Sequence, residues 1–221
     1  MEIFDIKGFR LCVNETHRFG TDALKLAEFV VGSGVPDAPY KIRNGQVICD
    51  LCTGCGIIPF ALLANGAEPA KIYALDIDES AINLLKESVK INKIKTVIPI
   101  NEDLKNITQI PAESVDLITV NPPYYKADGG FKRERDCTAR HEILCNLDDV
   151  VSAAARLLKF GGRLKMCHIP ERLADVICTL RKYNLEPKVI KLLTNNKKEP
   201  WLMLTDAKKG GKAGMKIYAE N

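Results

Sequence analysis

The tetrapeptide Asn121-Pro122-Pro123-Tyr124 combines residue types that suit the binding of a planar group bearing an NH2. Proline has no N–H donor, so the two prolines leave backbone carbonyls as acceptors, and the Asn121 side chain adds another acceptor. Two acceptors can take the two amino hydrogens while the ring stacks on Tyr124, which orients the nitrogen lone pair toward an electrophile. Taken alone, the motif also fits a proline-rich turn after a strand.

The second feature that could bind a ligand is a glycine-containing turn within Gln46–Gly56. From Asp50 the chain reads Asp-Leu-Cys-Thr-Gly-Cys-Gly. Glycines let a ligand approach the backbone, and a helix that starts behind the turn offers free N–H groups. The turn differs from the G-x-G-x-x-G fingerprint because Cys52 takes the place of the first glycine. Asp50 beside the turn favours a ligand with an amino group or positive charge over a pyrophosphate.

These residues need a sheet to bring them together, and the hydrophobic pattern predicts one. The expected strands are 47–51, 71–76, 96–100, 115–120, 162–169, 187–193 and 201–205, with the last two antiparallel. The expected helices are 57–64, 79–92, 146–159 and one that starts at Pro170. Residues 1–45 show no clear strands, and one capped helix is expected from Gly20-Thr21-Asp22. Strands alternating with helices predict an α/β fold with a mostly parallel sheet and helices on both faces.

Four polar side chains fall at the ends of expected strands: Asp50, Asp76, Asp103 and Asn121. In parallel sheets, ligands bind beyond the carboxyl ends of the strands, near the point where the strand order reverses. Asp76 lies 20 residues after Gly56, the distance at which an acid commonly meets ribose hydroxyls, although a helix cap or surface acid is the alternative. The pattern therefore predicts one ligand site at this edge.

The chain of 221 residues with 46% hydrophobic content is expected to form one domain with an ample core. We divide it into a helical N-terminal segment (1–45), a core (46–206) and a basic tail (207–221). It contains no uninterrupted apolar stretch of about 18 residues, so a membrane span is not expected. The first residues lack the form of a signal peptide, and eight cysteines then indicate free thiols in a reducing cytoplasm.

The net charge of +4 is mild but unevenly distributed. Eight lysines lie from Lys188 to Lys216, against only two acids, Glu199 and Asp206. Such a run is usually a solvated face, and a footprint for a phosphate backbone is the competing interpretation. Trp201, the only tryptophan, is expected to pack in the core.

Cys49, Cys52 and Cys55 have a C-x2-C-x2-C spacing, which invites a metal or iron–sulfur interpretation. No companion pair with similar spacing follows, and Cys49 falls inside an expected buried strand. We predict that these cysteines pack as small residues and that the chain holds no metal.

The order of the Asp50–Gly56 turn, the strand-ending Asp76 and the Asn-Pro-Pro-Tyr motif resembles class I S-adenosylmethionine-dependent amino methyltransferases. Three further stretches narrow the resemblance: His17–Ala23, Ala139–Glu142 and Lys208–Lys212. With them, the chain resembles the tRNA1(Val) adenine N6-methyltransferase family, which modifies the adenosine beside the anticodon. The resemblance spans nearly the whole chain. It implies a Rossmann-like fold with a seven-stranded sheet and a closing antiparallel hairpin.

The resemblance also implies roles for particular residues. Asp50, Thr53, Gly54 and Gly56 would contact the methionine part of S-adenosylmethionine, Asp76 and Ile77 the ribose side, and Asp103 the adenine amino group. Asn121, Pro122, Pro123 and Tyr124 would hold the target base, and Asn121 would also contact the cofactor. The residues that would contact tRNA are Arg18, Phe19, Lys132, Arg133, Arg140, His141, Lys208, Lys209 and Lys212. For Arg18 and Phe19, a surface loop with Phe19 tucked into the core is an equal interpretation, as is a merely solvated loop for the region 126–145. The expected partner is tRNA, and the expected state is a monomer.

Other functions use the same chemistry. A protein glutamine amide also presents a planar NH2, and glutamine methyltransferases of release factors share the Asn-Pro-Pro-Tyr motif. They usually carry a helical N-terminal domain, and only some 45 residues precede the first expected strand here. Other RNA or DNA adenine N6-methyltransferases form a second alternative, with the DNA enzymes disfavoured because no target-recognition domain is visible. A non-catalytic RNA-binding protein on this scaffold is the third, and the intact Asn121–Tyr124 motif argues against it.

Overall fold

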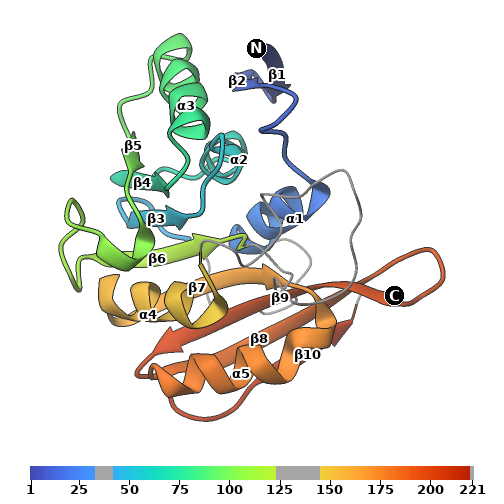
Figure 1. The fold of residues 1–221 in the computed structure, drawn as a ribbon. Coiled ribbons are helices and arrows are strands. Elements are labelled where there is room, and N and C mark those ends of the chain that lie inside the picture. The colour runs from blue at the N-terminus through green and yellow to red at the C-terminus, as the bar shows by residue number, and fades with distance from the viewer. Residues whose placement is uncertain (33–41, 123–144, 220–221) are drawn as a thin grey trace.

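The computed structural model describes residues 1–32, 42–122 and 145–219, and a central sheet organises them (Figure 1). The strands of this sheet are β3 (Val47–Leu51), β4 (Lys71–Asp76), β5 (Val97–Asn101), β6 (Val115–Val120), β7 (Leu158–His168), β8 (Leu185–Thr194), β9 (Pro200–Lys209) and β10 (Lys216–Ala219). The helices are α1 (Thr21–Val30), α2 (Ile57–Ala64), α3 (Glu79–Ile91), α4 (Leu147–Leu157) and α5 (Leu173–Lys182), with short 3-10 turns η1 (Leu104–Asn106) and η2 (Pro170–Arg172).

The eight strands follow the order β10-β8-β9-β7-β6-β3-β4-β5. Strands β3 to β7 are parallel to one another, and β9 pairs antiparallel with both β7 and β8. The chain builds outward from β3 to β5, returns to β6 beside β3, and then builds in the other direction. The strand order therefore reverses between β3 and β6, where a ligand site is expected.

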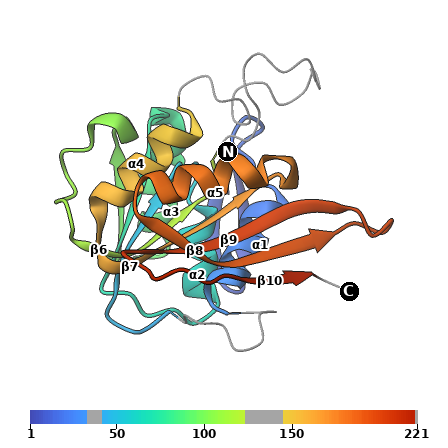
Figure 2. The ribbon, with the colours of Figure 1, turned by 90° about the horizontal axis from the view of Figure 1, so that it is seen from below.

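Helices cover both faces of the sheet (Figures 1 and 2). Helices α1, α2 and α3 enclose one apolar cluster with the sheet, and α4 and α5 enclose a second cluster on the opposite face. Local signals start these helices where the sequence predicts: Asp78 accepts hydrogen bonds from the N–H groups of Ser80 and Ala81, and Asn146 forms a capping box with Asp149. The predicted α/β class with a mostly parallel sheet is confirmed.

The N-terminal segment differs from the prediction. Strands β1 (Glu2–Ile6) and β2 (Phe9–Val13) form an antiparallel hairpin where we expected no strands. Its two-residue turn consists of Lys7 and Gly8, with φ of 49° and 92°. Hairpins with two-residue loops need this left-handed geometry, but Lys-Gly is a weaker signal than Asn-Gly. The hairpin packs through β2 on α2 and α3.

The sheet also has eight strands rather than seven. The additional strand, β10, lies in the predicted basic tail and runs parallel to β8. Its side chains are mostly exposed, so it lacks the apolar alternation that identifies a strand from sequence. Strand β7 also starts earlier than predicted, because Leu158 leaves α4 and pairs directly with Val115. In the described part of the chain, no helix has the length and apolar character to span a bilayer.

Candidate functional site

The turn after β3 has the backbone shape of a ligand-binding loop. Cys52, Gly54 and Gly56 have φ values of 56°, 55° and 91°. Cys52 thus adopts the left-handed conformation for which glycine is the usual residue. A Cβ on Gly56 would lie 2.4 Å from Cδ1 of Leu85, so this glycine lets the start of α2 approach α3 closely.

Asp50 is fully buried at the end of β3, where its Oδ1 accepts a hydrogen bond of 2.5 Å from the Thr119 hydroxyl. Burial raises the pKa of Asp50 to about 7, although the hydrogen bond from the Thr119 hydroxyl acts in the opposite direction. Within the described residues, Asp50 Oδ2 and Thr53 Oγ1 are buried without a hydrogen-bond partner. A buried, unpartnered carboxylate oxygen beside an unpartnered hydroxyl fits a ligand that brings a charged amino group.

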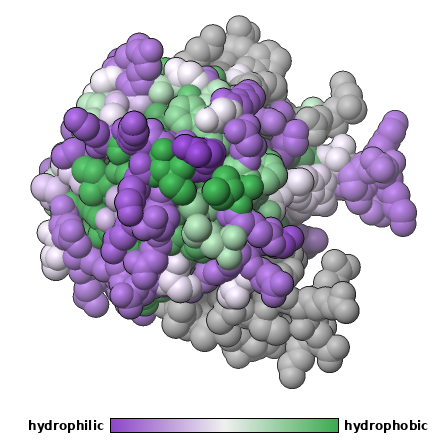
Figure 3. All heavy atoms as spheres, turned by 90° about the horizontal axis from the view of Figure 1, so that it is seen from above, coloured by the Kyte–Doolittle hydropathy of each residue, from purple (hydrophilic) through white to green (hydrophobic). Residues whose placement is uncertain are grey.

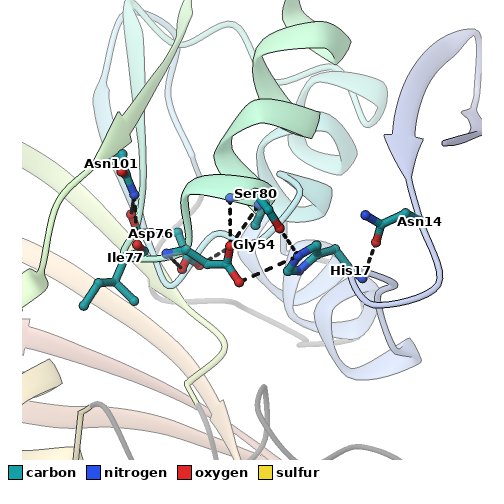
Figure 4. A network of polar contacts seen from close by, with 9 residues as sticks. Asn14, His17, Gly54, Asp76, Ile77, Ser80 and Asn101 are labelled. Carbon is teal, nitrogen blue, oxygen red and sulfur yellow. Dashed lines mark hydrogen bonds and ion pairs between the residues drawn. The ribbon is translucent and has the colours of Figure 1, made fainter.

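Asp76 closes the same turn from the end of β4. Its Oδ2 accepts the N–H of Gly54 at 2.7 Å, and its Oδ1 accepts the N–H of Asp78 at 3.0 Å (Figure 4). Burial raises the pKa of Asp76, and the two backbone N–H groups partly offset this effect. The carboxylate therefore fixes the backbone of the turn.

Two side chains that sequence reasoning did not assign to the site surround Asp76. His17 Nε2 is hydrogen-bonded to Ser80 Oγ and lies 3.7 Å from Asp78 Oδ2. The Asn101 amide, at the end of β5, donates to the backbone carbonyls of Asp76 and Ile77 at 3.1 and 2.9 Å (Figure 4). Asn101 carried a usable signal, because it directly follows the predicted strand 96–100. His17 begins a stretch that carries the family resemblance, but its place beside Ser80 and Asp78 could not be predicted, because the loop that holds it reaches α3 only in the folded chain.

A hollow next to this turn gathers several predicted cofactor residues. It is lined by Cys52, Leu75, Asp76, Ile77, Asp103, Leu104 and Cys145. Ile77 is 44% exposed, so it presents an apolar surface to the hollow. Asp103 caps η1 by accepting the N–H of Lys105 at 2.9 Å. The structure therefore brings Asp76, Ile77 and Asp103 together around one hollow, and their roles toward a cofactor remain predictions.

Asn121 follows β6, the strand beside β3, and so lies next to the Asp50 turn. Its Oδ1 accepts a hydrogen bond from the Cys167 thiol on β7, with a sulfur–oxygen distance of 3.0 Å. This contact orients the carboxamide from the neighbouring strand. Pro122 is buried. The predicted site residues Pro123, Tyr124, Lys132, Arg133, Arg140 and His141 lie outside the described residues.

The N-terminal residues predicted to contact tRNA hold the β1–β2 hairpin in place. The Arg18 guanidinium donates to both carboxylate oxygens of Glu2 at 3.0 and 3.1 Å. The ring of Phe19 meets that of Phe4 edge-on, with centroids 5.0 Å apart. Both side chains therefore have structural contacts, and a tRNA contact remains a prediction.

The C-terminal lysines predicted to contact tRNA lie at the opposite edge of the sheet. Lys208 pairs with Arg163, near the start of β7, whereas Asn121 contacts Cys167 near the end of that strand. The Lys209 ammonium donates to Glu113 at 3.0 Å and to the Leu158 carbonyl at 2.8 Å. Lys212, which follows β9, is also distant in register from the strand ends that carry Asp50, Asp76 and Asn121. The structure does not bring these lysines to the candidate site.

The cysteines of the C-x2-C-x2-C stretch do not share one environment. Cys49 belongs to the apolar cluster under α4 and α5, and Cys55 belongs to the cluster on the other face of the sheet. Burial raises the pKa of Cys49 and raises that of Cys55 to about 11, so both remain thiols near neutral pH. These contacts fit packing as small residues, and the absence of a metal remains a prediction.

The sequence of this chain is similar to those of known methyltransferases. The family model described as the TRM5/TYW2 methyltransferase domain matches residues 38–128. A tRNA1(Val) (adenine(37)-N6)-methyltransferase of Aeromonas salmonicida is 30% identical over 76% of this chain and 66% of its own length. The chain spans between 52% and 66% of the length of the curated relatives that it matches.

Solved structures share the fold at low identity. A predicted O-methyltransferase from Agrobacterium tumefaciens has a TM-score of 0.66 at 18% identity, covering 90% of this chain and 85% of its own. M. jannaschii TYW2, solved in complex with AdoMet, has a TM-score of 0.61 at 18% identity, covering 93% and 84%. This chain therefore has the fold of the methyltransferases in this comparison and is similar in sequence to the tRNA1(Val) (adenine(37)-N6)-methyltransferases, as the motif resemblance predicts.

Proposed function

We propose that this chain transfers a methyl group from S-adenosylmethionine to N6 of an adenine in tRNA, at the adenosine beside the anticodon. One observation carries the proposal. Asn121, the amine-holding residue of the motif, follows β6 directly beside β3, which ends in the Asp50–Gly56 turn at the reversal of strand order. The similarity to tRNA adenine N6-methyltransferases supports an adenine in tRNA as the group that receives the methyl.

The residues around the turn fit S-adenosylmethionine. The unpartnered oxygens of Asp50 and Thr53 suit its amino group, the Gly54–Gly56 backbone suits close approach, and the hollow with Asp76, Ile77 and Asp103 offers acid groups and an apolar surface to a nucleoside. When bound, the cofactor supplies an electrophilic methyl group on a sulfonium. The chain's task is to bring an amino nitrogen in line with it.

Asn121 performs the central part of that task in our proposal. Its carboxamide oxygen accepts one hydrogen of the adenine NH2, and the Pro122 carbonyl accepts the other. Methyl transfer forms the N–C bond, breaks the methyl–sulfur bond with its electron pair going to sulfur, and places positive charge on the nitrogen. Acceptors that already hold the nitrogen's hydrogens stabilise this charge until one hydrogen leaves as a proton to water. Stacking of the base on Tyr124 completes the predicted set.

The proposal is tested by offering labelled S-adenosylmethionine with unmodified tRNA and a release factor side by side, followed by digestion of the product. We expect label in N6-methyladenosine. Asn121→Ala should abolish turnover while cofactor binding, measured by equilibrium dialysis, survives. Asp76→Ala should instead weaken cofactor binding, so the two variants serve as controls for each other. Label on protein glutamine, or wild-type turnover by Asn121→Ala, would contradict the proposal.

Several properties accompany this function as predictions. The seven cysteines in the described residues are free, which fits a reducing cytoplasm. We also propose a single domain, a monomer and a reaction without metal. Gel filtration with light scattering tests the oligomeric state, and activity after chelation tests the metal prediction.

A further inference from the structure

We propose that the tip of the β8–β9 hairpin, residues 194–201, contacts the tRNA strand next to the target base. In this proposal, Trp201 stacks on an unpaired base, and Lys197 and Lys198 contact phosphates. The proposal rests on the function proposed above and assigns part of its substrate site to a segment whose residues were not among those predicted to contact tRNA.

The hairpin reaches beyond the edge of the sheet that carries the candidate site. Strand β7 ends at His168, which pairs with Met203 of β9. Because β9 runs antiparallel, the residues before Met203 extend past this end, and Figures 1 and 2 show the hairpin projecting from the body of the sheet. Figure 3 shows its tip as a hydrophilic projection.

The register places the tip close to Asn121. Val120 pairs with Met166, and Met166 pairs with Thr205, so Asn121 lies level with Leu204. Trp201 is three residues farther along β9 and two strands across, which amounts to about 10 Å in each direction and about 14 Å between the two backbone positions. By strand alternation Trp201 lies on the α4–α5 face with Met203, whereas Asn121 contacts Cys167 on the other face, so the nucleic-acid strand has to cross the strand ends. A strand of a few nucleotides can span that distance from a base held at Asn121.

Hydrogen bonds within the tip hold its shape. The Asn195 side-chain oxygen accepts the N–H groups of Lys197 and Glu199 at 2.8 and 3.0 Å, and the Asn195 amide donates to the Glu199 carboxylate at 3.1 Å. Glu199 is therefore engaged by Asn195. Among the residues that the structure describes, neither Lys197 nor Lys198 forms an ion pair, and both are exposed. The tip thus presents two lysines without an ion pair, beside the single acid Glu199, on a preorganised turn.

Trp201 does not pack in the core as expected from the sequence. It is 37% exposed and belongs to neither apolar cluster of the described residues. Its ring lines a shallow hollow with Thr194, Asn195, Asn196, Lys197 and Glu199. An exposed aromatic ring next to lysines is the combination by which proteins bind single-stranded nucleic acid, because every base offers a face for stacking.

The chain contains one tryptophan, so its intrinsic fluorescence reports directly on the tip. Titrating the full chain with unmodified tRNA should quench this fluorescence in a saturable manner. Trp201→Phe should retain most of the affinity, whereas Trp201→Ala should weaken tRNA binding by about one to two powers of ten and leave cofactor affinity unchanged.

The charge contribution is tested with paired variants. Lys197→Gln/Lys198→Gln should lower the slope of log affinity against log salt by about 1.4, the value for two phosphate contacts on a single strand. Lys93→Gln/Lys95→Gln is the matched control: both lysines are exposed, they lie between α3 and β5 at the opposite edge, and Lys93, like Lys198, has a left-handed backbone. The control should keep the wild-type slope.

The outcomes separate this proposal from the proposed function. If wild-type protein methylates tRNA but the hairpin variants bind like wild type, only the hairpin proposal fails. The hairpin proposal would also be overturned if Lys208→Gln/Lys212→Gln lowered the slope of log affinity against log salt and the Lys197/Lys198 variant did not. That result would place the tRNA contact at the edge of the sheet that carries Lys208. If wild-type protein methylates a release factor and tRNA leaves Trp201 unquenched, both proposals fail.

Discussion

At the scale of single residues, the candidate site depends on polar groups held where water is scarce. Asp50 is fully buried, and only one of its carboxylate oxygens meets a hydrogen-bond donor in the described residues. Such an arrangement costs stability in the free protein and favours a ligand that supplies the missing donor. Asp50 thus lowers the stability of the free protein and makes the site selective for a ligand with an amino group.

The raised pKa of Asp50 predicts a pH dependence of cofactor binding. With a pKa of about 7, the carboxyl is mostly protonated below neutral pH, whereas a charged amino group binds its ionised form. Affinity should therefore rise with pH by up to about tenfold per unit below 7 and then level off. Titration calorimetry between about pH 5.5 and 7.5 measures this, since an α-amino group stays largely protonated in that range. Asn at this position removes the titrating group, so Asp50→Asn should show a flat profile, and a flat wild-type profile would exclude the role.

At the scale of elements, the turn between β3 and α2 couples the site to the packing of helices. Gly54 and Gly56 both have left-handed backbones but differ in their surroundings. A Cβ on Gly54 meets no atom within 4 Å, whereas a Cβ on Gly56 would meet fully buried Leu85 of α3 at 2.4 Å. Gly54 therefore serves the shape of the loop, and Gly56 also serves the contact between two helices.

This difference predicts unequal effects of alanine. Gly54→Ala should cost about 1 kcal/mol, the strain of a non-glycine residue in the left-handed region. Gly56→Ala adds a clash in a packed core, so it should cost about 2–4 kcal/mol. Urea denaturation of both variants measures the free energy of unfolding. Equal losses would contradict the proposed role of the Leu85 contact.

At the scale of the whole molecule, a buried polar row crosses the sheet on the face covered by α1. Asp50, Thr119, Lys165 and Asp206 are paired in register across β3, β6, β7 and β9. The Lys165 ammonium donates to the carbonyls of Phe29 and Val30 at the end of α1, at 3.2 and 3.4 Å, and desolvation lowers its pKa to about 8. The row thus joins the candidate site, α1 and the strand that carries the hairpin.

Asp206 is the acid that compensates the buried positive charges of this row. Arg163 donates to both of its oxygens at 2.8 and 2.7 Å, and Lys165 lies 3.9 Å away. Asp206→Ala would leave two buried cations with less compensation, so we expect a loss of about 3–5 kcal/mol in unfolding free energy. Glu28→Ala, which removes an exposed ion pair with Lys25, is the control and should cost less than about 1 kcal/mol. Similar urea midpoints for the two variants would contradict the importance of the row.

The sequence by itself determined the order of the central strands and helices and the residues at which the strands end. Apolar periodicity is local, and parallel strands bring their carboxyl ends to one edge, so Asp76, Ile77 and Asp103 could be predicted to meet. Motif resemblance added the class of cofactor and acceptor.

Only the tertiary structure decided which distant segments reach that edge. Lys208 and Trp201 both belong to β9, yet they lie near opposite ends of that strand. Pairing with β7 and β8 sets the direction of β9, so only Trp201 lies at the end of the sheet that carries the candidate site. Likewise, His17 reaches Ser80 only because the β1–β2 hairpin packs on α3. Long-range pairing leaves little trace in local composition, and for that reason the lysine-rich C-terminal region could be noticed in the sequence but not oriented.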